Sequence, residues 1–103
     1  MILDVLEQAI RGKRCLAALH KGTRRRFAPH AVGFTSKNIP GAFVFQYGGD
    51  TTSAPPFKGE WRCLHIEDLS HLAENGDPWR MASNYSLARQ TCLERIALKV
   101  PEN

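Results

Sequence analysis

Cysteine is scarce in this sequence, and the few cysteines follow no metal-binding pattern. There are three, Cys15, Cys63 and Cys92, widely spaced, and none belongs to a Cys-x-x-Cys pair. An odd, sparse set predicts neither a disulfide framework nor a local zinc clamp. We therefore expect reduced, mostly buried thiols, as in a cytosolic protein.

Long hydrophobic runs and leader-like segments are also missing. No apolar stretch approaches the length of a membrane span, and the first four residues lack the basic region and apolar core that open a signal peptide. These absences predict a cytoplasmic protein that has no membrane partner.

The motifs of common enzyme classes are absent too. The sequence contains no Gly-x-Ser-x-Gly, no His-Glu-x-x-His and no glycine-rich phosphate or dinucleotide motif. Cys63 and His65 share a strand face, but zinc needs four ligands, usually from tight local pairs, and no second such pair is present. We therefore expect a protein that is not an enzyme and that holds neither a metal nor a cofactor.

What the sequence does have is the size and balance of one ordinary globular domain. It is 103 residues long and 43% hydrophobic, with 14 lysines and arginines against 10 acidic residues and a net charge of +4. This length predicts a single domain over residues 1–103 with one core. The modest basic excess fits a polyanion partner, and it equally fits a merely basic surface.

Hydrophobic spacing predicts one helix and then a series of strands. Apolar residues recur at helical spacing over 2–11, and Gly12 is a natural stop. A hairpin follows, turning near Gly22, and Pro29 marks a bulge or an edge position in its second strand. The expected strands are 15–19, 24–34, 42–47 and 61–66, with a turn at 38–41, irregular structure over 48–60 and a helical turn over 67–72.

The C-terminal third is ambiguous. Residues 92–100 fit a helical template and also alternate like a strand. We expect a turn at 77–78, a short helix near 87–92 and a closing strand over 94–100, because a fifth strand would cover an open sheet edge. The whole pattern predicts a mostly β fold, in which an N-terminal helix precedes a small β-barrel of about five strands.

Strand alternation places two arginines on core-facing positions. Arg25 shares a face with Phe27, and Arg62 shares a face with Leu64 and Ile66. A buried unpaired charge is costly, so each arginine must be paired or lie at a barrel mouth. Two guanidinium groups meeting there would form a site for phosphate or carboxylate. The alternative is structural ion pairing with nearby acids, namely Asp50, Glu67 or Asp68.

Two further features could face a nucleic acid or simply serve the fold. The basic run from Lys21 to Arg26 is either a solvated hairpin face or a patch that contacts phosphates. Phe43, Phe45 and Tyr47 alternate on one strand face, where they either fill the core or stack on bases.

Two stretches together resemble the WYL domain family. Residues 20–30 are similar to its pattern of a turn glycine followed by Arg-x-apolar-x-Pro, with Arg25, Phe27 and Pro29 on the motif and His30 following. Residues 62–69 resemble its second motif, with Arg62 on the first arginine. The chain departs from the family at the Trp-Tyr-Leu tripeptide, replaced near residues 42–44, and at histidines 20 and 65 and Asp68, where the family has tyrosine or arginine.

The resemblance implies a small Sm-like or SH3-like β-barrel with a regulatory sensing role. Its partner would be an anionic ligand such as a nucleotide or single-stranded nucleic acid, clamped by Arg25 and Arg62. We expect His30 and His65 to add hydrogen-bond donors, and Tyr47 or Trp61 to stack on a base. The alternatives are a protein-interaction or self-association module, forming a homo-oligomer through a sheet edge, and a small nuclease-like enzyme. The sequence does not identify the ligand.

Overall fold

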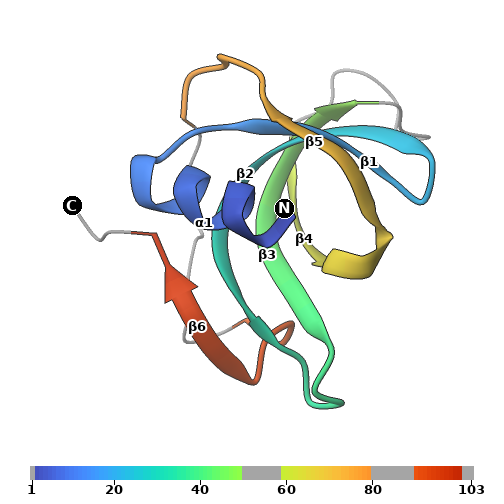
Figure 1. Cartoon of the computed structure of the whole chain (residues 1–103), viewed down its shortest axis with the longest axis vertical. Helices are drawn as coiled ribbons and strands as arrows, with labels where there is room; N and C mark the ends of the chain where they lie inside the picture. Colours follow the sequence, from blue (N-terminus) through green and yellow to red (C-terminus); the bar gives the residue numbers. More distant parts are fainter. Residues whose placement is uncertain (1, 50–58, 80–89, 101–103) are drawn as a thin grey trace.

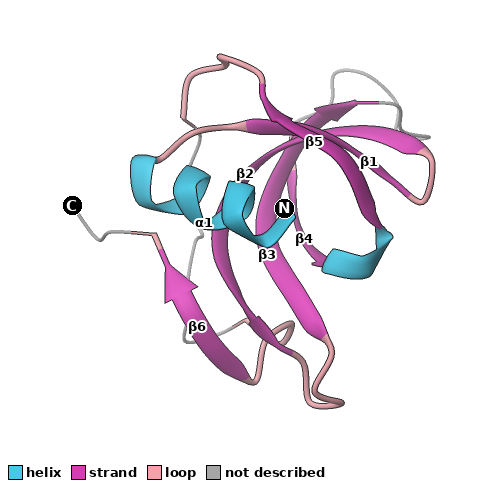
Figure 2. Cartoon of the chain, viewed as in Figure 1, coloured by secondary structure: helices cyan, strands magenta, loops and turns pink. Residues whose placement is uncertain are grey.

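The domain consists of one N-terminal helix and a single antiparallel sheet (Figures 1 and 2). The computed structural model describes residues 2–49, 59–79 and 90–100. In those residues no helix is long and apolar enough to cross a membrane. The elements are α1 (Ile2–Gly12), β1 (Leu16–His20), β2 (Thr23–Phe34), β3 (Pro40–Gly49), β4 (Glu60–His65), the 3-10 turn η1 (Ile66–Asp68), β5 (Leu69–Glu74) and β6 (Arg95–Lys99).

The sheet is organised around the long strand β2. The strand order is β4-β3-β2-β1-β5, and β6 lies off this path, paired with β2. The first part of β2 pairs with β1, its last four residues pair with β6, and β3 runs along nearly all of it. The sheet curls strongly (Figure 1), yet no ladder joins β4 to β5 in the described residues. The mostly β class is therefore confirmed, whereas a closed barrel is not shown.

The concave face of the sheet and α1 share the main core. The helix buries Leu6, Ala9 and Ile10, the stripe that the sequence pattern predicts, with Asp4 and Arg11 placed favourably for the helix dipole. This stripe packs against an inner cluster formed by core residues of the strands, including Leu16, Ala18, Phe27, Val32, Ala42, Val44 and Leu64. Each large apolar side chain buried here contributes roughly 1.5–3 kcal/mol.

The opposite face of the sheet is also covered in part, by residues 77–79 and 92–93. Tyr47 packs with Cys15 and Ala28, and Phe43 packs with Ala31 and Leu93. Phe43 and Tyr47 are therefore buried, as the core interpretation of the alternating aromatics predicts. Side chains on both faces of β3 pack into apolar clusters, which explains why residues 41–48 are all buried except the half-buried Phe45.

Most predicted elements are present, with some boundary corrections. The hairpin turns at Gly22, whose φ is +82°, and a register shift in the β2–β3 ladder follows Pro29. Residues 69–72 were expected to be helical but belong to β5, because pairing with β1 outweighs the local pattern. Strand β3 extends to Gly49 and β4 begins at Glu60, within the segment expected to be irregular.

The closing strand also forms, as β6. Of the short helix expected near residues 87–92, positions 87–89 lie outside the described residues, and 90–92 are not helical. Gly33 allows the backbone of β6 to lie close against β2, because a Cβ at this position would collide with the carbonyl oxygen of Arg95. Such a close backbone approach is a common reason for a glycine within a strand.

The cysteines correct a second expectation. Cys63 and Cys92 form a disulfide, with their Cα atoms 5.5 Å apart and a sequence separation of 29. The expectation of three reduced thiols was wrong because sequence spacing does not reveal which distant segments become neighbours. Only Cys15 is free and buried, as predicted. Its thiol donates to the carbonyl oxygen of Pro78 over 3.3 Å.

Candidate anion-binding site

Arg25 and Arg62 both begin on the core-facing side of the sheet. Arg25 is the cross-strand partner of Ala18, and Arg62 is the partner of Val44. Ala18 and Val44 belong to the inner cluster, so both arginines share its face, as strand alternation predicts. Gln46 lies two residues after Val44 in β3 and therefore joins them.

These three side chains carry polar atoms that the fold leaves unbonded. Arg25 makes no hydrogen bond or ion pair with any residue that the structure describes, and its Nε is buried. The Nε of Arg62 is likewise buried without a partner, although its Nη2 lies 2.6 Å from Oε1 of Glu60. Gln46 is fully buried, and neither its amide oxygen nor its amide nitrogen is bonded.

None of the acids expected to neutralise the arginines pairs with them in the described residues, and Glu67 makes no ion pair there with either arginine. Glu60, which the sequence interpretation did not consider, pairs with Arg62. Asp68 instead pairs with Lys21 over 3.9 Å, and Asp50 is outside the described part of the chain. Arg25 is therefore a half-buried cation without an acidic partner among the described residues, where buried charges are ordinarily paired.

The positive charges of both arginines affect the pKa of His20. Its pKa is lowered, first by burial and next by the positive charge of Arg25, and Arg62 acts in the same direction. Asp68 opposes this effect, and Lys21 adds to it. The imidazole next to the arginines is thus favoured in its neutral form, which can accept or donate one hydrogen bond.

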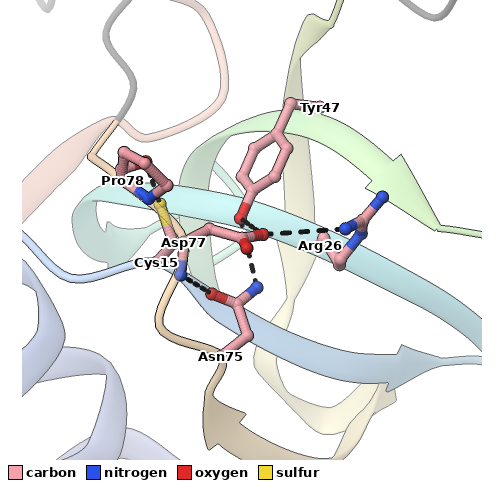
Figure 3. Close-up of polar contacts among 6 residues, drawn as sticks. All are labelled: Cys15, Arg26, Tyr47, Asn75, Asp77 and Pro78. Atoms are coloured by element: carbon pink, nitrogen blue, oxygen red, sulfur yellow. Dashed lines mark hydrogen bonds and ion pairs between the residues drawn. The ribbon is translucent and has the colours of Figure 1, made fainter.

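Tyr47 takes part in a partly buried polar network (Figure 3). Its hydroxyl donates to Oδ2 of Asp77 over 2.6 Å and accepts from Nδ2 of Asn75 over 3.1 Å. The Arg26 guanidinium lies 5.8 Å from the Tyr47 ring centroid and 3.7 Å from Asp77. Burial, followed by the bond to Asp77, raises the Tyr47 pKa. The network fastens residues 75–78 to β2 and β3.

His30 is buried among aromatic rings. Its Nδ1 donates to the Ala28 carbonyl over 2.8 Å, and its ring lies 4.8 Å from the rings of both Trp61 and Trp79. Burial lowers its pKa to about 4, so it is neutral at pH 7. Trp61, the other residue expected to stack on a base, stacks on Phe43 at 4.9 Å.

The predicted ligand residues divide between two cavities. Arg62 and His65 line one of about 650 Å³, next to the disulfide, together with Trp61. Arg25 lines another of about 660 Å³ on the β1–β2 hairpin, with Arg24, Arg26 and His71. His30 and Tyr47 are not among the residues that line either of them.

The sequence interpretation missed Gln46 and His20 as neighbours of the arginines. Gln46 could have been found from strand alternation, since it is a polar residue at a core-facing position among aromatics. His20 shares the inward face with Ala18, two residues earlier in β1. In the described part of the chain, no three His, Cys, Asp or Glu side chains gather closely enough to hold a metal ion.

Comparison with known proteins adds no relative. Neither a protein-family model, nor a curated protein, nor a solved structure matches this chain.

Proposed function

We propose that this domain is an anion-binding regulatory module of the WYL-like type, built on a curled sheet of the Sm-like or SH3-like barrel class. Its ligand is held by Arg25 and Arg62. The observation that carries this proposal is the Arg25 guanidinium, which has no partner among the described residues and shares a face with Arg62 and Gln46.

The chemistry of these groups selects the ligand class. Guanidinium groups offer several donors in a planar fork that matches phosphate or carboxylate oxygens. The side chain of Arg62 is 41% exposed, so its charged end is open to a ligand although its Nε is covered. Leaving a buried polar group unbonded costs about 1–3 kcal/mol, and Arg25, Gln46 and Arg62 together carry several such atoms. A phosphate group of a nucleotide or single-stranded nucleic acid supplies the missing acceptors for the arginines.

Replacing Arg25 by glutamine is expected to weaken anion binding about 10- to 100-fold, because a hydrogen bond to a charged group contributes about 1.5–3 kcal/mol. Fluorescence anisotropy with labelled single-stranded RNA and DNA, competed by free nucleotides across a salt series, measures this loss. If the arginines contact phosphates, the affinity should fall steeply as the salt concentration rises. The slope of log affinity against log salt concentration then estimates the number of phosphate contacts.

Arg11→Gln is the matched control, because it removes the same charge from the exposed last turn of α1. Its affinity should stay within about twofold of the parent, as expected for a distant charge screened by salt. If Arg25→Gln and Arg11→Gln weaken binding equally, only net charge matters and the arginine site is excluded. Thermal melting of both variants checks that each remains folded.

Self-association through β6 is the second candidate function. The strand pairs only with β2 in the described residues, and Ile96 is 39% exposed on it. A cavity of about 500 Å³ runs beside residues 96–99. Unpaired strand edges readily accept a second copy. Sedimentation should then give a mass that rises from monomer to dimer with concentration, whereas a constant monomer mass excludes this function.

A further inference from the structure

The Cys63–Cys92 disulfide is placed where an external thiol can reach it. Cys63 is exposed in β4, whose only ladder in the described residues is with β3. The cavity of about 650 Å³ that contains Arg62 and His65 is also lined by both bridged cysteines. Disulfides that serve only stability resist reduction, whereas exposed ones are the labile and regulatory class. Its accessibility to an external thiol therefore distinguishes this bridge from a buried disulfide that serves only stability.

The bridge fastens one particular part of the chain, residues 90–100, here called the C-terminal segment. Apart from the disulfide, this segment is held by the buried side chains of Leu93 and Val100, the β6 ladder and two further backbone hydrogen bonds. The exposed Arg95 adds a hydrogen bond to Asn38 and lies over the Phe34 ring. That ladder is short: β6 has five residues, four of which are exposed, and its register shifts midway. Exposed, short pairings open at low free-energy cost. The disulfide is thus the strongest single attachment of the segment.

The C-terminal segment covers the outer aromatic face of the sheet. Leu93 packs on Phe43 and Ala31, with Trp61 and Cys92 at the border of the same cluster. The N–H of Val100 donates to the carbonyl oxygen of His30 over 2.8 Å, and Glu94 N–H donates to Phe34 over 2.8 Å. Detaching the segment would uncover an apolar surface centred on Phe43 and would also withdraw Val100 from the edge of the main core.

We propose that the Cys63–Cys92 disulfide is a thiol-exchange site that fastens and releases the C-terminal segment. The co-reactant is a dithiol. One of its thiolates attacks Sγ of Cys63, the S–S bond breaks, and the electron pair leaves on Sγ of Cys92, which takes a proton from water. The second thiol of the dithiol then displaces Cys63 from the mixed disulfide. The protein gains two electrons and two protons, and the dithiol becomes a cyclic disulfide.

The test is reduction of the oxidised full chain by dithiothreitol without denaturant. Alkylation with iodoacetamide followed by mass measurement should show two modified cysteines, while buried Cys15 stays protected. Hydrogen exchange should then become at least tenfold faster at the amides of β6. The β1–β2 hairpin should exchange only as fast as global unfolding of the reduced protein allows, and β6 should exchange faster than the hairpin.

Two variants complete the experiment. Cys63→Ser with Cys92→Ser should show fast β6 exchange with or without dithiothreitol. Cys15→Ala keeps the bridge and should respond to dithiothreitol like the parent. Three outcomes overturn the proposal: a bridge that is reduced only in denaturant, a β6 whose exchange is unchanged after reduction, or a β6 that exchanges no faster than the β1–β2 hairpin after reduction. The last would make the disulfide a general staple.

Discussion

Replacing Cys63 and Cys92 together by serine is expected to lower the free energy of unfolding by about 3–4 kcal/mol, because the bridge closes a long loop in the unfolded chain. The two cysteines are 29 positions apart, and the loop-closure entropy of that separation sets the size of the effect. Small domains are stable by only about 5–15 kcal/mol, so the change is large but leaves the domain folded.

Urea unfolding followed by tryptophan fluorescence measures the loss. Trp61 borders the cluster that contains Cys92 and is therefore well placed to report it. Dithiothreitol should shift the parent to the midpoint of the double serine variant and leave that variant unchanged. Cys15→Ala is the matched control, since it removes a thiol without touching the bridge. If the oxidised and reduced parent unfold at the same urea concentration, the disulfide does not contribute to the free energy of unfolding.

Local pattern was sufficient for much of this fold. The helical stripe of α1, the turn at Gly22, the bulge after Pro29 and the closing strand β6 all follow from residues within a few positions of one another. Strand β5 does not, because its local pattern predicts a helical turn and only pairing with β1 makes it a strand. The disulfide cannot be predicted from local pattern at all, because it depends on the tertiary structure that brings Cys92 beside Cys63 in β4.

Local pattern likewise locates only part of the candidate site. Alternation locates Arg25 and Arg62 because a side chain's face within a strand is a local property. His30 and Tyr47 satisfy the same local rules, yet they lie on a face that Asp77, Trp79 and Leu93 cover from the far end of the chain. Only the tertiary structure shows that these two residues are enclosed.

The enclosure of His30 predicts how stability depends on pH. Its pKa is about 4 in the folded protein, against an ordinary value of 6.5 that the unfolded chain should approach. Between these values the unfolded chain binds a proton that the folded protein excludes. The stability that His30 contributes is therefore complete above pH 6.5 and is lost as the pH falls toward 4. The loss amounts to about 3 kcal/mol, at about 1.4 kcal/mol per pH unit.

Urea unfolding at a series of pH values between 7 and 4 compares the parent with His30→Gln, which cannot titrate. The variant should be less stable at pH 7, because it disturbs the packing against Trp61 and Trp79, but its stability should fall less steeply below pH 6.5. His20→Gln is the control, because the pKa of His20 is lowered in the same direction while its ring is only half-buried. The acidic side chains are the same in all three proteins, so their contribution cancels in the comparison. Parallel curves for the parent and His30→Gln would show that His30 takes up its proton without opening the aromatic cluster.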